Sequence, residues 1–208
     1  MDGLEPDGIA VLNADLDTFD VLQSHAATGR HNVTTFGANA DWALGDVRIT
    51  DSATVIAARH DGTDYLFKLT VPGRHFAMNA VAVLAACDAL GADPVQAAQD
   101  ICQWQPPEGR GRREVIVLDR GIAEETLDLI DDAFNANPTS MTAALEVLAA
   151  STPRDGVGRI VKGRRVAILG DMLELGRDEM AMHAALADDR HLAGAHIVHC
   201  AGPRMRAL

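Results

Sequence analysis

A segment rich in polar side chains, residues 131–141 with the sequence DDAFNANPTSM, follows an expected strand and precedes an expected helix. Ligands of open α/β sheets bind beside the carboxyl ends of the strands, where this segment would lie. Its two aspartates and two asparagines could hold a nucleotide ribose or a polar substrate. In the alternative interpretation, Asn137 caps the helix, Pro138 occupies the first turn and the aspartates are solvated. The cap is expected in either case, but it does not account for the other polar side chains.

Three further segments carry residues that could contact a ligand. GDMLELG, residues 170–176, follows an apolar run, although a strand-to-helix turn with glycines at tight positions is the simpler interpretation. GRHFAMN, residues 73–79, begins an apolar helix whose N-terminus attracts anions, and His75 and Asn79 share one helix face. Taken alone, such a histidine is more often a cap or a core residue. EGRGRR, residues 108–113, is either an exposed basic hinge or a set of arginines that bind phosphate oxygens bidentately.

Composition limits the class of protein. The chain has 208 residues, 48% of them hydrophobic, which is enough to bury a core in one large or two small domains. With 18 basic against 30 acidic residues and a net charge of -12, it lacks the basic surface that nucleic-acid binding requires. We find no signal-peptide pattern and no apolar run of about 18 residues, so we expect a cytoplasmic protein with no membrane partner. Cys87, Cys102 and Cys200 are too widely spaced to indicate a disulfide framework or a zinc site.

The elements that must position these segments alternate between strands and helices. In the first half we expect strands at 9–12 and 32–36 and a hairpin of 54–58 and 65–71 around Asp61-Gly62. We expect one helix over 18–25 that is capped by Asp17, and another over 75–90 that is buried on most sides. A short helix should extend to about residue 102, with Asp93 as its cap, Pro94 in its first turn and Gln96 as the capping-box partner. The proline-rich residues 105–109 are the expected domain boundary. Beyond them we expect strands at 115–118, 126–130, 166–169 and 196–200, a turn at 119–121, and helices at 138–150 and 177–189. This order predicts an α/β protein whose second half is a mostly parallel sheet covered on both faces.

Together the four segments resemble the Mur ligase family of ATP-dependent peptide ligases. DDAFNANPTSMTAAL and GDMLELG are similar to the signature of the branch that adds D-alanyl-D-alanine to UDP-N-acetylmuramoyl tripeptide, and PGRHFAMN and PPEGRGR are less specific. The resemblance extends over essentially the whole chain. It implies the C-terminal half of a P-loop-type central ATPase domain over residues 1–107, followed by an incomplete Rossmann-like Mur ligase C-terminal domain over residues 108–208.

The resemblance also implies roles for individual residues. Asn79 matches the asparagine that contacts the adenine, with His75 just before it in the ATP-binding segment. Phe76 stands where the superfamily often has asparagine, so only Asn79 is expected to contact the base. Arg110 matches the catalytic arginine that reaches the γ-phosphate of ATP, and Asp132 matches the aspartate that holds the ribose. The residues expected to face the peptide or the incoming dipeptide are Asn135, Asn137, Ser140, Asp171, Glu174 and His183.

In this family ATP activates a peptide carboxylate as an acyl phosphate, which the amine of D-alanyl-D-alanine then attacks. Mg²⁺, arginine and lysine must gather around the developing charge. The sequence contains no Gly-x-x-x-x-Gly-Lys-Ser/Thr pattern, nor the expected UDP-sugar domain and carbamylated lysine, so most Mg²⁺ ligands would lie in a preceding part. We therefore expect a chain that is inactive alone and belongs to a monomeric ligase. One alternative is a non-catalytic nucleotide- or peptide-binding module with the same fold. Another is a folate-glutamate ligase, which the DDAFNANP loop disfavours.

Overall fold

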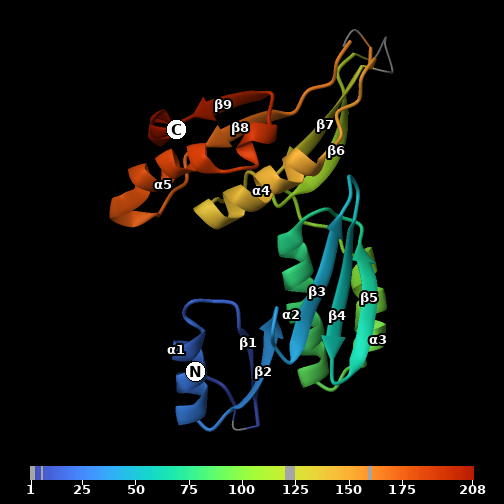
Figure 1. Cartoon of the computed structure of the whole chain (residues 1–208), viewed down its shortest axis with the longest axis vertical. Helices are drawn as coiled ribbons and strands as arrows, with labels where there is room; N and C mark the ends of the chain where they lie inside the picture. The colour runs from blue at the N-terminus through green and yellow to red at the C-terminus, as the bar shows by residue number, and fades with distance from the viewer. Residues whose placement is uncertain (1–2, 6, 120–124, 159–160) are drawn as a thin grey trace. The chain divides into compact units, whose positions relative to one another are not determined.

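The chain folds into two compact units, Met1–Trp104 and Gln105–Leu208, in the computed structural model (Figure 1). The structure describes residues 3–5, 7–119, 125–158 and 161–208. Strands and helices are mixed in both units, which confirms the expected α/β class. Among the described residues, no helix has the length and apolar character needed to cross a bilayer.

A five-stranded sheet in the order β1-β2-β3-β4-β5 forms the centre of the first unit. Its β1, β2 and β3 pair in parallel, whereas β3, β4 and β5 pair in antiparallel fashion. The strands are β1 (Ile9–Asn13), β2 (Asn32–Gly37), β3 (Trp42–Ile49), β4 (Thr54–His60) and β5 (Thr63–Leu69). The helices are α1 (Phe19–Thr28), α2 (Arg74–Ala89) and α3 (Pro94–Asp100), with a 3-10 turn at Ile101–Gln103.

The hairpin expected around Asp61 and Gly62 is confirmed. These two residues have φ angles of 45° and 75°, as a tight turn with two left-handed residues requires. Strand β3, by contrast, was not predicted. Its pairing with β4 shifts register between Leu44 and Val47, so the alternation of apolar side chains that would indicate a strand is interrupted.

Helix α2 packs along the sheet and closes the core of the first unit. Its buried side chains form one stripe at helical spacing: Ala77, Ala80, Val81, Leu84 and Ala85. Its exposed residues are Arg74, Asn79 and Val83 and the others are buried or partly buried, which agrees with the expectation of a helix buried on most sides. Where α2 meets the sheet, its buried side chains form one hydrophobic cluster with the fully buried Trp42 and Ile56. Full burial of a side chain such as that of Ile56 stabilises the folded state by about 1.5–3 kcal/mol.

Two of the expected helix starts differ in detail. Helix α1 begins at Phe19 without any side-chain cap, so the expected capping role of Asp17 is wrong. Asp93 does cap α3, because its carboxylate accepts the Val95 N–H at 2.8 Å. Its expected partner Gln96 instead donates to Asp100 at 2.9 Å, so no capping box forms there.

Among its described residues, the second unit has two small two-stranded sheets rather than one larger sheet. The first is the antiparallel pair β6 (Arg112–Val117) and β7 (Thr126–Asp131), and the second is the parallel pair β8 (Val166–Gly170) and β9 (Ile197–Ala201). The expected mostly parallel sheet is therefore wrong for the described residues. Residues 118–125 connect β6 to β7, and this is shorter than the dozen or so residues that a parallel crossover needs. Part of the turn expected at 119–121 lies outside the described residues.

Helices and 3-10 turns complete the second unit. These elements are α4 (Pro138–Ala150), α5 (Glu179–Ala185), and 3-10 turns at Gly176–Asp178, Leu186–Asp188, Leu192–Gly194 and Arg204–Ala207. The expected helix over 177–189 is thus a shorter α5 with a 3-10 turn at each end. Met141 and Leu145 of α4 pack with Leu169 of β8, and Met172 and Met205 join the same cluster.

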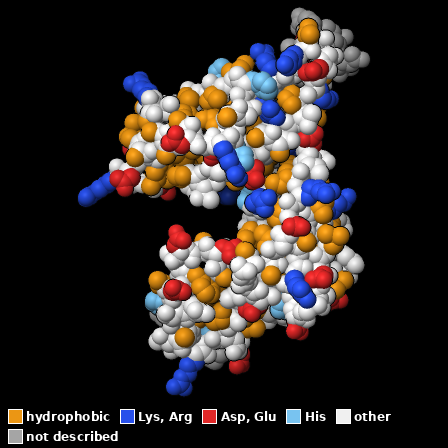
Figure 2. Space-filling model, in the orientation of Figure 1, with side chains coloured by type: hydrophobic (Ala, Val, Ile, Leu, Met, Phe, Trp, Pro, Cys, Tyr) orange, Lys and Arg blue, Asp and Glu red, His pale blue; other side chains and the backbone are white. Residues whose placement is uncertain are grey.

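One face of the β8-β9 sheet carries exposed apolar side chains. Ala167 and Leu169 are buried in the core, whereas the alternating Val166 and Ile168 are exposed on the opposite face. Figure 2 shows hydrophobic side chains gathered on the surface of this unit. Within the described residues, the sheet is therefore covered on one face and not on both.

Candidate functional site

The start of helix α2 is anchored to the sheet by a buried hydroxyl. Thr54 donates to the Val71 carbonyl at 2.8 Å and accepts the Gly73 N–H at 2.9 Å. Gly73 has a φ of 148°, a conformation that side chains disfavour. The helix therefore begins at a fixed point, with His75 half-buried in its first turn and Asn79 exposed one turn later. An exposed amide offers both a donor and an acceptor, which is the pattern that an adenine edge requires.

In the second unit, the structure brings the basic hinge and the polar loop together. The guanidinium carbon of Arg110 lies 4.1 Å from the centre of the Phe134 ring. Two backbone bonds join the segments: the Phe134 N–H donates to the Gly109 carbonyl at 3.0 Å, and the Gly111 N–H donates to the Asp131 carbonyl at 2.8 Å. A cation over an aromatic face is attracted to it, and the planar guanidinium keeps its in-plane donors for a phosphate. Arg110 is therefore an exposed cation with a defined place beside the loop.

Within the polar loop, the cap of α4 is confirmed. The Asn137 side chain accepts the Ser140 N–H at 2.9 Å, and the Ser140 hydroxyl accepts the Asn137 N–H at 2.9 Å. Asn135 uses its side-chain oxygen to accept the Ala136 N–H at 2.9 Å. Asp132 is exposed. Asn137 and Ser140 thus bind each other, and the exposed Asp132 directly follows β7.

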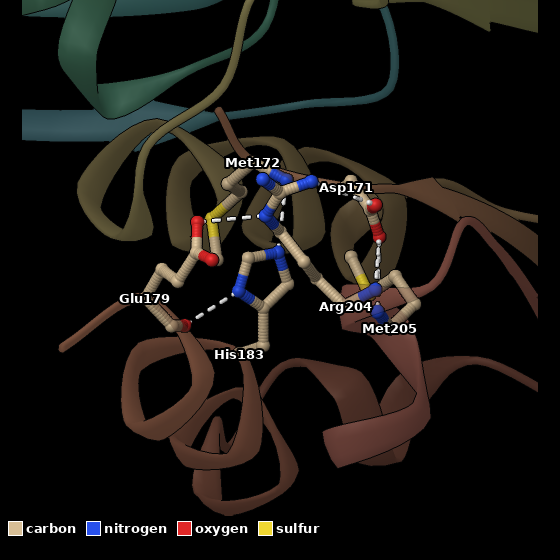
Figure 3. A network of polar contacts seen from close by, with 6 residues as sticks. All are labelled: Asp171, Met172, Glu179, His183, Arg204 and Met205. Atoms are coloured by element: carbon tan, nitrogen blue, oxygen red, sulfur yellow. Dashed lines mark hydrogen bonds and ion pairs between the residues drawn. The ribbon is translucent and has the colours of Figure 1, made fainter. Parts of the chain in front are cut away.

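The loop after β8 is held by a charged network (Figure 3). One carboxylate oxygen of Asp171 accepts the N–H groups of Arg204 at 3.0 Å and Met205 at 2.9 Å, and the other lies 3.5 Å from the Arg204 guanidinium. Arg204 also donates to the Glu179 carboxylate at 2.7 Å. Burial of Asp171 disfavours its charge, but these donors outweigh that effect and the pKa of its carboxyl lies below the ordinary value. The Glu179 carboxylate, followed by Asp171, raises the pKa of Arg204.

His183 supports the same loop from the interior. The ring is fully buried, its Nε2 accepts the Met172 N–H at 2.9 Å, and its Nδ1 lies 2.6 Å from the Glu179 carbonyl. The neutral tautomer with hydrogen on Nδ1 satisfies both contacts. Its side chain does not reach the surface, so its contribution to a ligand site is to hold the backbone at Met172. Glu174 lies at the exposed tip of the loop with a φ of 61°.

The two loops of the second unit meet at one hydrophobic cluster. Ala136 from the polar loop packs against the cluster that contains Leu169 and Met172. Both loops begin where strands end, at Asp131 of β7 and Gly170 of β8. The structure thus connects Arg110, the Asp132 loop and the Glu174 loop within the second unit, whereas His75 and Asn79 belong to the first. No group of three or more candidate metal ligands occurs among the described residues.

Three residues of this arrangement were missed from the sequence. Phe134 lies inside the recognised motif, and an aromatic residue two positions after Asp132 could have been considered as a partner for a cation. Arg204 and Glu179 had no local signal, because Arg204 is 33 residues from Asp171 and 25 from Glu179.

Two family models match the chain. Residues 1–87 match the Mur ligase middle domain, and residues 111–208 match the model described as "Mur ligase, glutamate ligase domain". The chain belongs to the Mur ligase family.

Similar proteins cover almost the whole chain but are themselves longer. The UDP-N-acetylmuramoyl-tripeptide--D-alanyl-D-alanine ligase of Escherichia coli is 33% identical over 211 residues, which covers 99% of this chain and 42% of that protein. A crystal structure of MurF from Acinetobacter baumannii superimposes with a TM-score of 0.80 at 24% identity, covering 98% of this chain and 40% of its own. MurF from Thermotoga maritima, solved in complex with ADP, gives a TM-score of 0.73 at 20% identity, covering 98% and 42%. The chain therefore spans about two fifths of the length of these relatives, and the two structures show likeness of fold.

Proposed function

We propose that this chain contributes the second half of the ATPase domain and the peptide-side domain of a cytoplasmic ligase. That ligase adds D-alanyl-D-alanine to UDP-N-acetylmuramoyl tripeptide in peptidoglycan synthesis. The observation that carries the proposal is the Arg110 guanidinium 4.1 Å from the Phe134 ring, at the start of the DDAFNANPTSM loop. The names of the similar ligase from Escherichia coli and of the ADP-bound ligase from Thermotoga maritima support it.

In this proposal the residues assigned to ATP are His75, Asn79, Arg110 and Asp132. Asn79 pairs with the adenine edge and His75 lies beside it, whereas Asp132 accepts the ribose hydroxyls. Arg110 meets the γ-phosphate, where its donors stabilise charge that is redistributed as the peptide carboxylate attacks. Mg²⁺ would neutralise charge on the phosphate groups, and the 208 residues contain no P-loop hydroxyl to hold it. The chain's own contribution to catalysis is then orientation and one cation.

The exposed tip of the 170–176 loop, with Glu174, faces the peptide or the incoming dipeptide in this proposal, as does Asn135. A carboxylate such as Glu174 would attract the ammonium group of a dipeptide. Asn137 and Ser140 form the α4 cap, so they act mainly by fixing the loop. Asp171 and His183 hold the second loop in place. The peptide side of the site is therefore built from two loop tips on rigid supports.

A non-catalytic nucleotide- or peptide-binding module is the second candidate, and the absence of a P-loop pattern from the 208 residues favours it. Phosphate release from ATP, measured with and without D-alanyl-D-alanine, distinguishes the two. We expect no dipeptide-dependent release from the chain alone. We expect release from a hybrid in which the N-terminal part of the Escherichia coli ligase precedes residue 1. A folded hybrid that binds ATP but never releases phosphate would favour the non-catalytic module. Release by the chain alone would contradict the proposal that the chain supplies only part of the ligase.

Replacing Asp132 with alanine in the hybrid is expected to raise the KM for ATP while changing kcat much less. A hydrogen bond to a charged group contributes about 1.5–3 kcal/mol, so the expected rise is roughly tenfold or more. The measurement is steady-state phosphate release at varied ATP. Asp188→Ala is the matched control, because Asp188 is an exposed aspartate of the same unit outside both loops. Equal KM values for the two variants would reject the ribose assignment.

A further inference from the structure

We infer that Arg204 is a positioning residue for the 170–176 loop and that the conformation it maintains governs binding of the incoming dipeptide. The first part stands on contacts within the second unit. The second part rests on the proposed function, which places the dipeptide at this loop.

The segment that follows β9 packs directly against the segment that follows β8. Because these strands are parallel, their carboxyl ends lie at the same edge of the sheet. Gly202, with a φ of 107°, makes the close approach possible, since a Cβ atom there would overlap the carboxylate of Asp171. The following turn then directs two backbone N–H groups at Asp171. The C-terminal turn of the chain is thereby attached to the base of the loop.

Arg204 ties both ends of the loop together. Its guanidinium contacts Asp171 at the beginning of the loop and Glu179 at the first position of α5, just beyond the loop's end (Figure 3). The three side chains are mostly shielded, with 33%, 11% and 30% of Arg204, Asp171 and Glu179 exposed. Beneath them, His183 contacts Met172 and the Glu179 backbone. One guanidinium therefore bridges two carboxylates that come from different elements.

The loop tip has a conformation that these anchors must maintain. Glu174 has left-handed backbone angles, which a residue other than glycine adopts only when its surroundings impose them. Leu173 before it is more than half exposed, whereas Leu175 after it packs against the hydrophobic cluster, so the core fixes one side of the tip and the anchors at Asp171 fix the other. With Arg204 removed, Asp171 and Glu179 lose their shared cation and the tip can relax. The geometry of Glu174 toward a bound amine is then lost without loss of the fold.

Hydrogen–deuterium exchange of the 208-residue chain tests the first part directly. We expect Arg204→Met to speed exchange of the amides of residues 171–176 roughly three- to tenfold, while the amides of α4 and of the five-stranded sheet keep their rates. Arg204→Lys should recover part of the protection, because a lysine retains one of the two ion pairs. Arg206→Met is the control, since Arg206 is an exposed arginine of the same turn. Unchanged loop exchange, or equally faster exchange throughout the second unit, would overturn the positioning role.

Kinetics of the hybrid ligase test the second part. Arg204→Met should raise the KM for D-alanyl-D-alanine severalfold and leave the KM for ATP unchanged, which a general loss of folded protein would not do. The KM of Arg204→Lys for D-alanyl-D-alanine should lie between those of the native hybrid and of Arg204→Met. If exchange is faster but the dipeptide KM is unaltered, Arg204 positions a loop that does not bind the dipeptide, and the second part is rejected. A hybrid that is inactive with the native residue rejects the proposed function and leaves the exchange result standing.

Discussion

Replacing Arg110 with methionine in the hybrid ligase is expected to lower kcat about a hundredfold, the usual effect of removing one preorganised donor from a developing charge. Methionine keeps much of the length and contact with Phe134 but carries no charge. Arg110→Lys should recover only part of the rate, because an ammonium group has no planar fork for two phosphate oxygens. Steady-state phosphate release at saturating ATP and dipeptide measures kcat.

The control for Arg110 is Arg112→Met, two positions along the same basic segment. Arg112 lies 3.2 Å from Glu114 on strand β6, so it already has an anionic partner there. The stability change should be small for both variants, about 0.5–1 kcal/mol for the lost contact with Phe134 and no more for the exposed pair. If Arg110→Met melted early but kept its kcat per folded molecule, Arg110 would be a hinge charge rather than a catalytic residue.

The elements that could be predicted from the sequence are those whose signals are local. The turn at Asp61-Gly62 and the cap by Asn137 depend on residues within one turn, and both are confirmed. Strand β3 was missed because its register shift breaks the alternating pattern. The antiparallel pairing of β6 with β7 was also missed, although the short connection between them excludes a parallel crossover.

The same distinction applies to the candidate site. The sequence located both loops, because each polar segment directly follows an apolar run. It did not separate the residues proposed to face a ligand from the residues that hold the loop. Asp171 and His183 were expected beside the substrate, but in the structure their side chains form hydrogen bonds with backbone groups. The supporting role of Asp171 is recognisable from its contacts with Arg204 and Met205, and that of His183 from its contacts with Met172 and Glu179.

Of the substitutions considered, His183→Leu has the largest expected effect on stability. His183→Leu should lower the free energy of unfolding of the second unit by about 2–3 kcal/mol. The substitution leaves the Met172 N–H without its acceptor in the core, and an unsatisfied buried polar group costs about 1–3 kcal/mol. The lost contact with the Glu179 carbonyl adds to this. His183→Gln should be milder, because its side-chain oxygen can accept the Met172 N–H.

Urea unfolding measures this effect and assigns it to one unit. The chain's two tryptophans, Trp42 and Trp104, both belong to the first unit, so their fluorescence reports that unit, whereas circular dichroism reports both. His183→Leu should move the dichroism transition to lower urea and leave the fluorescence midpoint unchanged. His199→Leu is the matched control, since His199 is exposed on β9 and its loss should shift stability by no more than about 0.5 kcal/mol. Equal midpoints for the two variants would show that the buried imidazole is not what holds the loop, and the anchoring would then fall to Asp171 and Arg204 alone.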